Sequence, residues 1–283
     1  MLEETCQKIL DCAKISGADQ ADVMAVHGTS ISIEVRKQAL EQIERSDGIE
    51  FGLRVFKGKR QAIVSGSDLS EASIKLMTER AVDMAKAAPE DPYCGLAKKS
   101  ELVAAWDVDE LELSDDQAEP QPEELENQAK EAEYFALENQ SVDQVQSASS
   151  AYSKTKIHLS ATNGFNGGYS KTSFSTSCVA IARSQSGLER DYDGDVRIFK
   201  RDLRSPEEIG IRAAKRAVSK LEARKPKTGV YPVIFDERVS SSLIGHLLAA
   251  TNGVAVAKGS SWLLNRKGTQ VLPEFLSITE DPY

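Results

Sequence analysis

Histidine and cysteine are scarce in this sequence, and their scarcity excludes several kinds of catalytic site. Three histidines, His27, His158 and His246, and four cysteines occur in 283 residues. The cysteines form no C-x-x-C pair and no zinc-ribbon spacing. In a reducing compartment we therefore expect free thiols that pack as small hydrophobic groups, and a metal site built from these cysteines is disfavoured.

The common motifs of hydrolases and nucleotide-binding proteins are also missing. There is no G-x-S-x-G elbow, no Walker loop and no G-x-G-x-x-G. The glycines at 164, 167 and 168 have the spacing of a turn between strands and not that of a phosphate cradle. A serine triad needs a histidine and a carboxylate beside a serine. His27 and His158 lie at the end of or within alternating strands, where we expect surface or edge residues.

Long apolar runs are absent too. No stretch approaches the roughly 18 to 20 apolar residues that a membrane span requires. The first residues, MLEETCQKILDCAKISGAD, begin with acids in a helical pattern and do not resemble a signal or transit peptide. We therefore predict a cytoplasmic protein with no membrane partner.

Charge is present in abundance but is unevenly distributed. The net charge is −9, and residues 101–147 hold 15 acids against one base, Lys130. This acidic stretch lacks the D-x-D-x-D-G pattern of a calcium loop, so it predicts a solvated linker and helix face. The acidic balance argues against tight binding to duplex DNA.

The stretch 197–227 has the opposite balance, with 11 Lys and Arg against 4 acids. It keeps a local contact with phosphates open as an alternative. Its charges span a strand and a helix without interleaved aromatic residues. We therefore expect Arg212, Lys215, Arg216 and Lys220 on the solvent side of the helix.

The hydrophobic pattern predicts an α+β fold of several domains, with mainly antiparallel sheets and packed helices. Residues 1–106 form a first domain: a helix, strands on either side of a join near Gly28 and Thr29, a hairpin over 48–67, and a helix that begins with a capping box at Asp68. An acidic linker with two prolines covers 107–122.

Residues 123–224 form a second predicted domain. A helix is expected from about Pro122 to Ser147, strands follow, and Ser205 with Pro206 marks the start of another helix. Residues 229–283 are the start of a C-terminal domain, with a strand at VYPVIFDERV that leads into a helix. So short a unit buries little core by itself, and we expect the sequence to be C-terminally truncated.

The helix VSSSLIGHLLAATNG, residues 239–253, contains one imidazole, that of His246. The catalytic helix of a zinc peptidase carries two imidazoles and a glutamate, and a catalytic zinc has three protein ligands and a water. The leucines that flank His246 favour a packed or capping histidine over a metal ligand.

Several stretches together resemble one known family. They are GADQADVMAVHG and the residues up to Tyr93, YSKTSFSTSCVAIA, GVYPVIFDERVSSSLIGHLLAATNG and KGSSWLLNRKGTQVLPE. Over essentially the whole chain the sequence resembles the TldD/PmbA family, also called modulators of DNA gyrase, and it is most similar to the PmbA/TldE branch.

The resemblance implies a two-subunit cytoplasmic protease whose TldD-type subunit binds zinc with an H-E-x-x-x-H helix and a distant cysteine. On that motif this chain has Ser241 for the first histidine, Ser242 for the glutamate and His246 for the second histidine. A serine hydroxyl is a poor zinc ligand and no general base at neutral pH. We therefore assign no catalytic and no metal-binding residue to this chain.

The predicted function is that of a non-catalytic PmbA/TldE-like subunit of a TldD/TldE-type zinc metallopeptidase. The resemblance implies a complex that degrades unfolded peptides and processes microcin-type peptides. No cofactor is expected in this chain, zinc is expected in a TldD-like partner, and nucleic acid is not expected as a partner. Two alternatives stay open: a DNA- or gyrase-associated regulatory protein, and a peptidase active in its own right.

Overall fold

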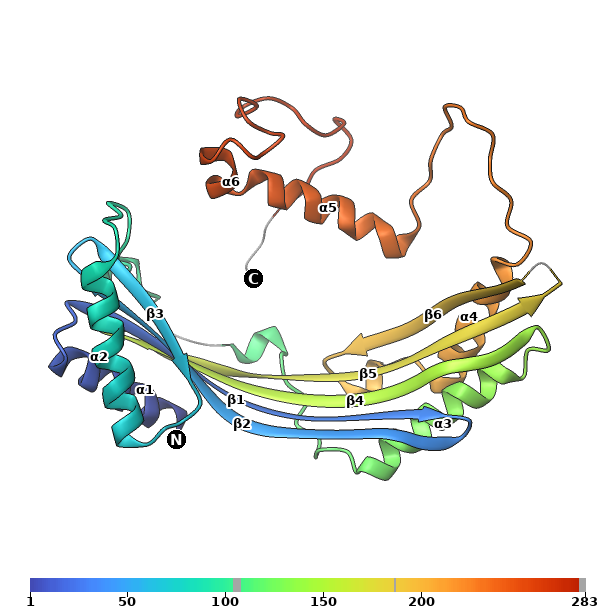
Figure 1. The fold of residues 1–283 in the computed structure, drawn as a ribbon, viewed down its shortest axis with the longest axis horizontal. Helices are drawn as coiled ribbons and strands as arrows, with labels where there is room; N and C mark the ends of the chain where they lie inside the picture. The colour runs from blue at the N-terminus through green and yellow to red at the C-terminus, as the bar shows by residue number, and fades with distance from the viewer. Residues whose placement is uncertain (104–107, 186, 280–283) are drawn as a thin grey trace. The chain divides into compact units, whose positions relative to one another are not determined.

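The computed structural model describes residues 1–103, 108–185 and 187–279 (Figure 1). The chain divides into two compact units, Met1–Ala223 and Arg224–Tyr283, which are described separately. The helices and strands of the first unit are α1 (Leu2–Ile15), β1 (Gln20–Arg36), β2 (Ala39–Lys57), β3 (Arg60–Gly66), α2 (Glu71–Ala87), α3 (Pro122–Leu137), β4 (Val142–Ala161), β5 (Asn166–Ser184), β6 (Gly187–Arg197) and α4 (Pro206–Ser219). Three short 3₁₀ turns accompany them: η1 (Lys99–Glu101), η2 (Asp109–Leu111) and η3 (Lys200–Asp202). The second unit contains α5 (Glu237–Thr251) and α6 (Gly253–Ala257).

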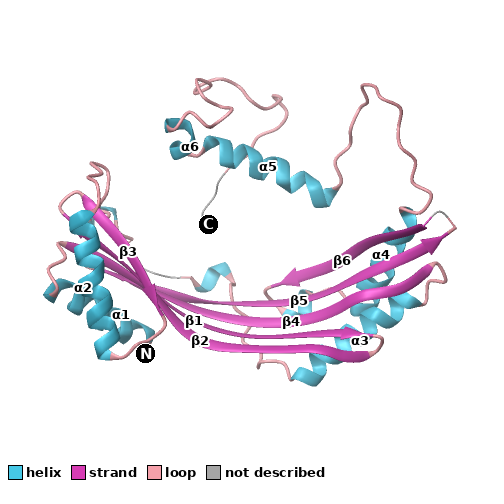
Figure 2. Ribbon diagram, viewed as in Figure 1, coloured by secondary structure: helices cyan, strands magenta, loops and turns pink. Residues whose placement is uncertain are grey.

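The first unit is built on one six-stranded sheet with the order β3-β2-β1-β4-β5-β6. Every neighbouring pair of strands is antiparallel. Figure 2 shows a curved sheet with α1 and α2 at one end and α3 and α4 at the other. This arrangement confirms the predicted α+β fold with antiparallel strands and packed helices.

β1 connects the two ends of this sheet because it pairs with β2 on one side and with β4 on the other. Strands of the predicted domain 1–106 and of the predicted domain 123–224 therefore share one sheet. The predicted boundary between residues 106 and 107 lies within the segment 104–107, outside the described residues. The boundaries 1–106, 107–122, 123–224 and 229–283 stay predictions.

Two hydrophobic cores lie on the same face of the sheet. The odd-numbered residues of β1 from Ala21 to Ala25 belong to the core beneath α1 and α2. Those from Ile31 to Val35 belong to the core beneath α3 and α4. Alternate residues of a strand point to the same face, so both helix pairs cover one side. We call the other side, which carries the even-numbered residues of β1 such as Gly28 and Ser30, the open face.

Local signals define the helix starts of this unit. The Ser205 hydroxyl accepts a hydrogen bond from Glu208 N at 3.1 Å, and Pro206 occupies the first turn, so the predicted start of α4 is confirmed. The cap of α2 is Ser70, and Asp68 accepts a hydrogen bond from Ser70 N at 2.9 Å. The predicted cap at Asp68 was therefore placed two residues early.

Three other element predictions were wrong. β1 runs unbroken through Gly28, which lies opposite Gly48 in the ladder with β2. The helix expected to reach Ser147 ends at Leu137, because Val142 and the residues after it pair with β5. Residues 231–236 form no strand.

The turn between β1 and β2 depends on a distant carboxylate. Lys37 and Gln38 have φ values of 55° and 60°, a left-handed conformation that residues other than glycine rarely adopt. Both backbone N–H groups donate to the carboxylate of Glu133 on α3 at 2.6 Å. Glu133 is 1% exposed. The Glu133 carboxylate therefore stabilises a turn conformation that Lys37 and Gln38 do not favour by themselves.

Candidate functional site

The helix α5 carries Ser241, Ser242 and His246, the positions that the resemblance matches to the peptidase motif, and its start is set by a side-chain cap. The Asp236 carboxylate accepts a hydrogen bond from Arg238 N at 3.1 Å. At the other end, Asn252 accepts bonds from Val254 N and Ala255 N, which ends α5 and begins α6. The only residue of α5 that is buried is Ala250, whose carbonyl accepts a bond from the hydroxyl of buried Ser261 at 2.6 Å.

All three motif positions are solvent-exposed on α5. The Ser242 hydroxyl donates to Val239 O at 2.5 Å, so its proton is directed at the helix backbone. Ser242 and His246 are four residues apart and share one side of the helix. His246 is not packed against a core, contrary to the favoured interpretation of a packed or capping histidine.

The donor set of α5 does not fit a zinc ion. Its motif positions offer one imidazole and two hydroxyls, whereas zinc sites use thiolates, imidazoles and carboxylates. Within residues 1–103, 108–185 and 187–279, no three His, Cys, Asp or Glu side chains gather as metal ligands would.

The other two histidines make contacts within the sheet. His27 Nε2 lies 3.1 Å from Asp47 Oδ1, and the Thr29 hydroxyl donates to Asp47 Oδ2 at 2.9 Å. The bonds from His27 and then Thr29 hold the pKa of Asp47 below its ordinary value. His158 Nε2 lies 2.8 Å from Asn166 Oδ1. Both histidines are half-buried on the two central strands, β1 and β4, so the predicted position at a sheet edge was wrong.

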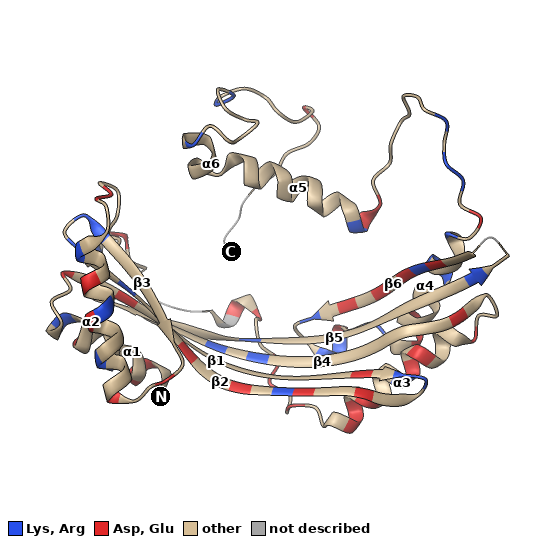
Figure 3. Ribbon diagram, in the orientation of Figure 1, with Lys and Arg blue, Asp and Glu red and all other residues tan. Residues whose placement is uncertain are grey.

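The basic stretch 197–227 faces a row of carboxylates on β6. Asp191, Asp193 and Asp195 alternate along this edge strand and are turned toward α4. Figure 3 shows the acidic residues of β6 in red beside the basic residues of α4 in blue. This row was not predicted, although the spacing D-x-D-x-D in 191–195 is a period of two.

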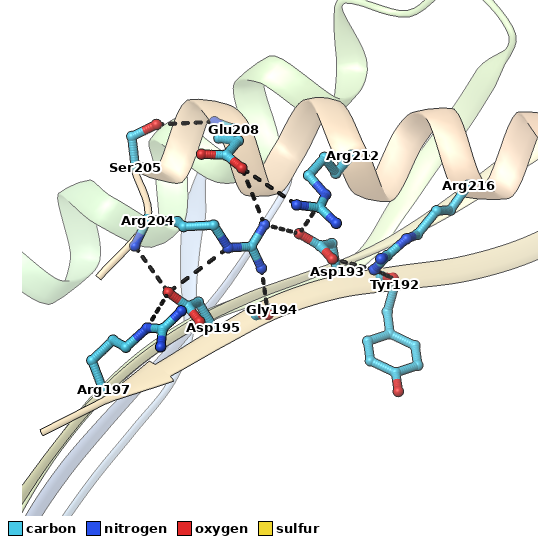
Figure 4. Close-up of polar contacts among 10 residues, drawn as sticks. All are labelled: Tyr192, Asp193, Gly194, Asp195, Arg197, Arg204, Ser205, Glu208, Arg212 and Arg216. Atoms are coloured by element: carbon cyan, nitrogen blue, oxygen red, sulfur yellow. Dashed lines mark hydrogen bonds and ion pairs between the residues drawn. The ribbon is translucent and has the colours of Figure 1, made fainter. Parts of the chain in front are cut away.

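Asp193 is the centre of this ion-pair network and is 2% exposed (Figure 4). Its carboxylate accepts a 2.7 Å bond from Arg204 Nη1 and a shorter one from Arg216, and Arg212 Nε lies 3.7 Å away. Arg204 also donates to Gly194 O at 2.7 Å. The expectation that Arg216 lines the solvent side of α4 was wrong, because its side chain is 20% exposed and pairs with Asp193 on β6. Arg212 is 39% exposed and pairs both with Glu208 on α4 and with Asp193.

The rest of the network consists of the contacts of Asp195 and of an ion pair at the C-terminal end of α4. Arg204 N donates to Asp195 Oδ2 at 3.0 Å, and Arg197 Nε donates at 3.1 Å. Burial opposes the charge on Asp195, but these bonds outweigh it and lower its pKa. Lys220 Nζ lies 3.0 Å from Asp191 Oδ2, and Lys215 is exposed to solvent as expected.

A shallow depression lies on the open face where β2, β1 and β4 meet. Two of the residues that line the depression, Gly28 and Gly48, lie opposite each other in the ladder and have no side chain. Ser30, Ser46 and Ser153 surround them. Its remaining lining consists of two threonine hydroxyls, the Val26 side chain and the carboxylate of Glu50. The depression is therefore mainly polar, with hydroxyls that both donate and accept hydrogen bonds.

Comparison with known proteins relates the whole chain to one family. Three family models match in order: PmbA/TldA metallopeptidase domain 1 at residues 21–85, the central domain at 115–221 and the C-terminal domain at 228–283. The chain is 33% identical to the metalloprotease PmbA of Escherichia coli over 285 residues and 31% identical to the PmbA homologue of Haemophilus influenzae over 284. It spans 62% of the length of each.

Solved structures show the same fold. A putative modulator of DNA gyrase from Bacteroides thetaiotaomicron is similar with a TM-score of 0.84 at 23% identity, over 94% of this chain and 60% of that one. TldE from Thermococcus kodakarensis is similar with a TM-score of 0.71 at 16% identity, over 92% of this chain and 58% of that one.

Proposed function

Because this chain belongs to the PmbA/TldD metallopeptidase family, we propose that it is the non-catalytic, PmbA/TldE-like subunit of a two-subunit cytosolic zinc peptidase. A TldD-like partner supplies the zinc and its activated water. This chain binds and encloses extended peptide. The substrates of the complex are unfolded polypeptides and peptide precursors of the microcin type.

One observation carries the proposal: α5 has hydroxyls where a zinc peptidase needs an imidazole and a carboxylate. Ser241 and Ser242 are exposed, and the Ser242 proton is directed to Val239 O. A neutral serine hydroxyl is a poor zinc ligand, and it does not act as a general base toward water at neutral pH. The likeness in fold to TldE agrees with the same assignment.

Reconstitution with a TldD-like subunit tests the proposal. The two chains are purified together, and cleavage of an unstructured peptide is measured for each chain alone and for the pair. We expect the pair to cleave, this chain alone to be inactive, and the partner alone to be strongly impaired. Full-rate cleavage by the partner alone would make this subunit dispensable and contradict the proposal.

Metal analysis separates this proposal from a peptidase that is active in its own right. We expect the purified chain to hold far less than one zinc per molecule, with no change in His246→Ala. His27→Ala serves as the matched control, because His27 pairs with Asp47 and not with the motif. Stoichiometric zinc that is lost only in His246→Ala would assign the chemistry to this chain instead.

The DNA- or gyrase-associated alternative depends on the basic stretch 197–227. Arg204, Arg212 and Arg216 are engaged by Asp193, which reduces the positive potential available to phosphates. We therefore expect no measurable duplex binding at low salt. Binding whose affinity falls steeply with salt would favour the alternative.

A further inference from the structure

Two lysines of β4 lie in the gap between the two hydrophobic cores. Lys154 and Lys156 are even-numbered, like Tyr152, so their side chains extend from the helix-covered face of the sheet. Tyr152 belongs to the core beneath α3 and α4. Two residues beyond Lys156, His158 O accepts a hydrogen bond from the Cys6 thiol of α1 at 3.6 Å. The two lysines therefore lie between the part of β4 that contacts α3 and the part that contacts α1.

A cavity of about 640 Å³ lies against these lysines. One part of its lining belongs to the sheet and includes Lys154, Lys156 and Ser170, which lies opposite Lys156 in the ladder with β5. Another part is the segment 112–116, which contributes Glu112, Leu113, Ser114 and Asp116. Small-molecule sites in proteins have volumes of roughly 300–1,000 Å³. We call this site, with its mainly polar lining, the lysine cavity.

The segment 112–116 is fixed against β5 by hydrogen bonds. Thr172 of β5 donates its N–H to Leu113 O at 3.1 Å, and its hydroxyl accepts a bond from Asp115 N at 2.7 Å. The carboxylate of Asp115, which is 5% exposed, accepts a bond from Lys200 N at 3.0 Å. A lining that is already ordered loses little conformational entropy when a ligand binds. The segment therefore presents its side chains to the lysine cavity from a fixed backbone.

Four charged side chains of the lysine cavity have no partner within the part of the chain that the structure describes. The ammonium groups of Lys154 and Lys156 form no hydrogen bond and no ion pair there, and neither do the carboxylates of Glu112 and Asp116. Lys154 is half-buried, and the other three are exposed. The lysines belong to the strand and the acids to the segment. Charges of opposite sign therefore enter the cavity from different parts of its lining, and both signs are available to a ligand.

A ligand with one charge of each sign matches this lining better than a simple anion. Phosphate would meet two carboxylates as well as two ammonium groups, and like charges oppose binding. Both termini of a free peptide are charged at pH 7. We propose that the lysine cavity binds a short peptide with free termini, whose carboxylate contacts Lys154 and Lys156 and whose ammonium group contacts Glu112 and Asp116. The choice of a peptide rests on the proposed function, because a peptidase complex releases such peptides.

A titration of the dipeptide Ala-Ala with the purified 283-residue chain, followed by ligand-observed NMR at low salt, tests the site. We expect saturable binding with a Kd on the order of 1 mM, because partly exposed ion pairs contribute little each. Amidation of the carboxylate or acetylation of the amine removes two ion pairs and is expected to weaken binding about five- to tenfold. Absence of saturable binding, or displacement of the dipeptide by an equimolar amount of inorganic phosphate, would overturn the proposal.

Two double variants assign each terminus of the peptide to its part of the lining. Lys154→Gln with Lys156→Gln is expected to bind Ala-Ala and its amide about equally, because the carboxylate is no longer recognised. Glu112→Gln with Asp116→Asn is expected to bind Ala-Ala and its N-acetyl derivative about equally. Circular dichroism checks that each variant is folded. Selectivity for both free termini that survives in the two variants would contradict the proposed contacts.

Matched controls exclude an effect of net charge alone. Lys8, Lys171, Glu131 and Glu207 are exposed and do not line the cavity. Lys8→Gln with Lys171→Gln, and Glu131→Gln with Glu207→Gln, change the net charge as the two double variants do. They are expected to keep the affinity and both selectivities of the wild type, and equal weakening would contradict the site. The titration uses this chain alone and measures no cleavage, so its failure is distinct from failure of the reconstitution with a TldD-like subunit.

Discussion

At the scale of single residues, Glu133 has the clearest structural role. Its buried carboxylate accepts bonds from Lys37 N and Gln38 N, which lie in a turn without glycine. Glu133→Ala leaves two turn amides without a charged acceptor, so we expect a loss of about 2–4 kcal/mol in the free energy of unfolding. Urea denaturation measures it. Glu131→Ala, at an exposed position of α3, is expected to change stability by less than about 0.5 kcal/mol.

The cysteines provide a second test at this scale. All four are free, as expected; Cys6, Cys94 and Cys178 are buried, and Cys12 is half-buried. Burial raises the pKa of Cys178 to about 12, and only the thiolate is nucleophilic. In native protein at pH 8 we expect alkylation of Cys12 first and of Cys178 last, measured by mass spectrometry of peptides. Early labelling of Cys178 would show that the core beneath α3 and α4 opens readily.

At the scale of elements, the contact between β6 and α4 depends on Asp193. Its removal leaves the guanidinium groups of Arg204 and Arg216, which are 21% and 20% exposed, without their principal acceptor. Breaking a largely buried pair costs more than the pair contributes. We expect Asp193→Ala to lower the free energy of unfolding by roughly 2–4 kcal/mol. Glu207→Ala, exposed in the first turn of α4, is the control.

The same contact predicts an acid-sensitive contribution to stability. The pKa of Asp195 is lower in the folded chain than its ordinary value, so its contribution is present above about pH 4 and is lost as the pH falls further. Asp195→Asn is therefore expected to be less stable than the wild type at pH 7. The difference should shrink below about pH 4. A difference that persists at pH 3 would mean that packing, and not charge, is responsible.

The helix starts could be predicted because their determinants lie close together in the chain. Ser205 and Pro206 define the start of α4 within four residues. The predicted break in β1 at Gly28 was wrong, because glycine favours a turn locally but here pairs with Gly48. That pairing depends on the whole ladder between β1 and β2 and not on neighbouring residues. The side of α4 on which Arg216 lies was predicted wrongly for a similar reason. Arg216 pairs with Asp193 on β6, and that contact depends on the packing of the helix on the sheet. For residues 239–253 the sequence predicted the helix but not that His246 is exposed.

At the scale of the whole molecule, the two units differ in how much they bury. Among the described residues of the second unit, the buried ones are Ala250 and Ser261. Amides with few buried apolar contacts open at low free energy. We therefore expect the amides of α5 to exchange with deuterium much faster than those of β1 and β4, as measured by mass spectrometry. Equal protection would show that α5 is covered in solution.

The continuous β1 has a consequence for how this family of sequences can vary in length. Its odd-numbered residues serve one core near Ala25 and another near Ile31. Deleting a single amino acid between them would turn one set of apolar side chains to the opposite side while the other set stayed in place. Insertions and deletions in the middle of this strand are therefore tolerable only in twos, and the neighbouring strands have to change with them.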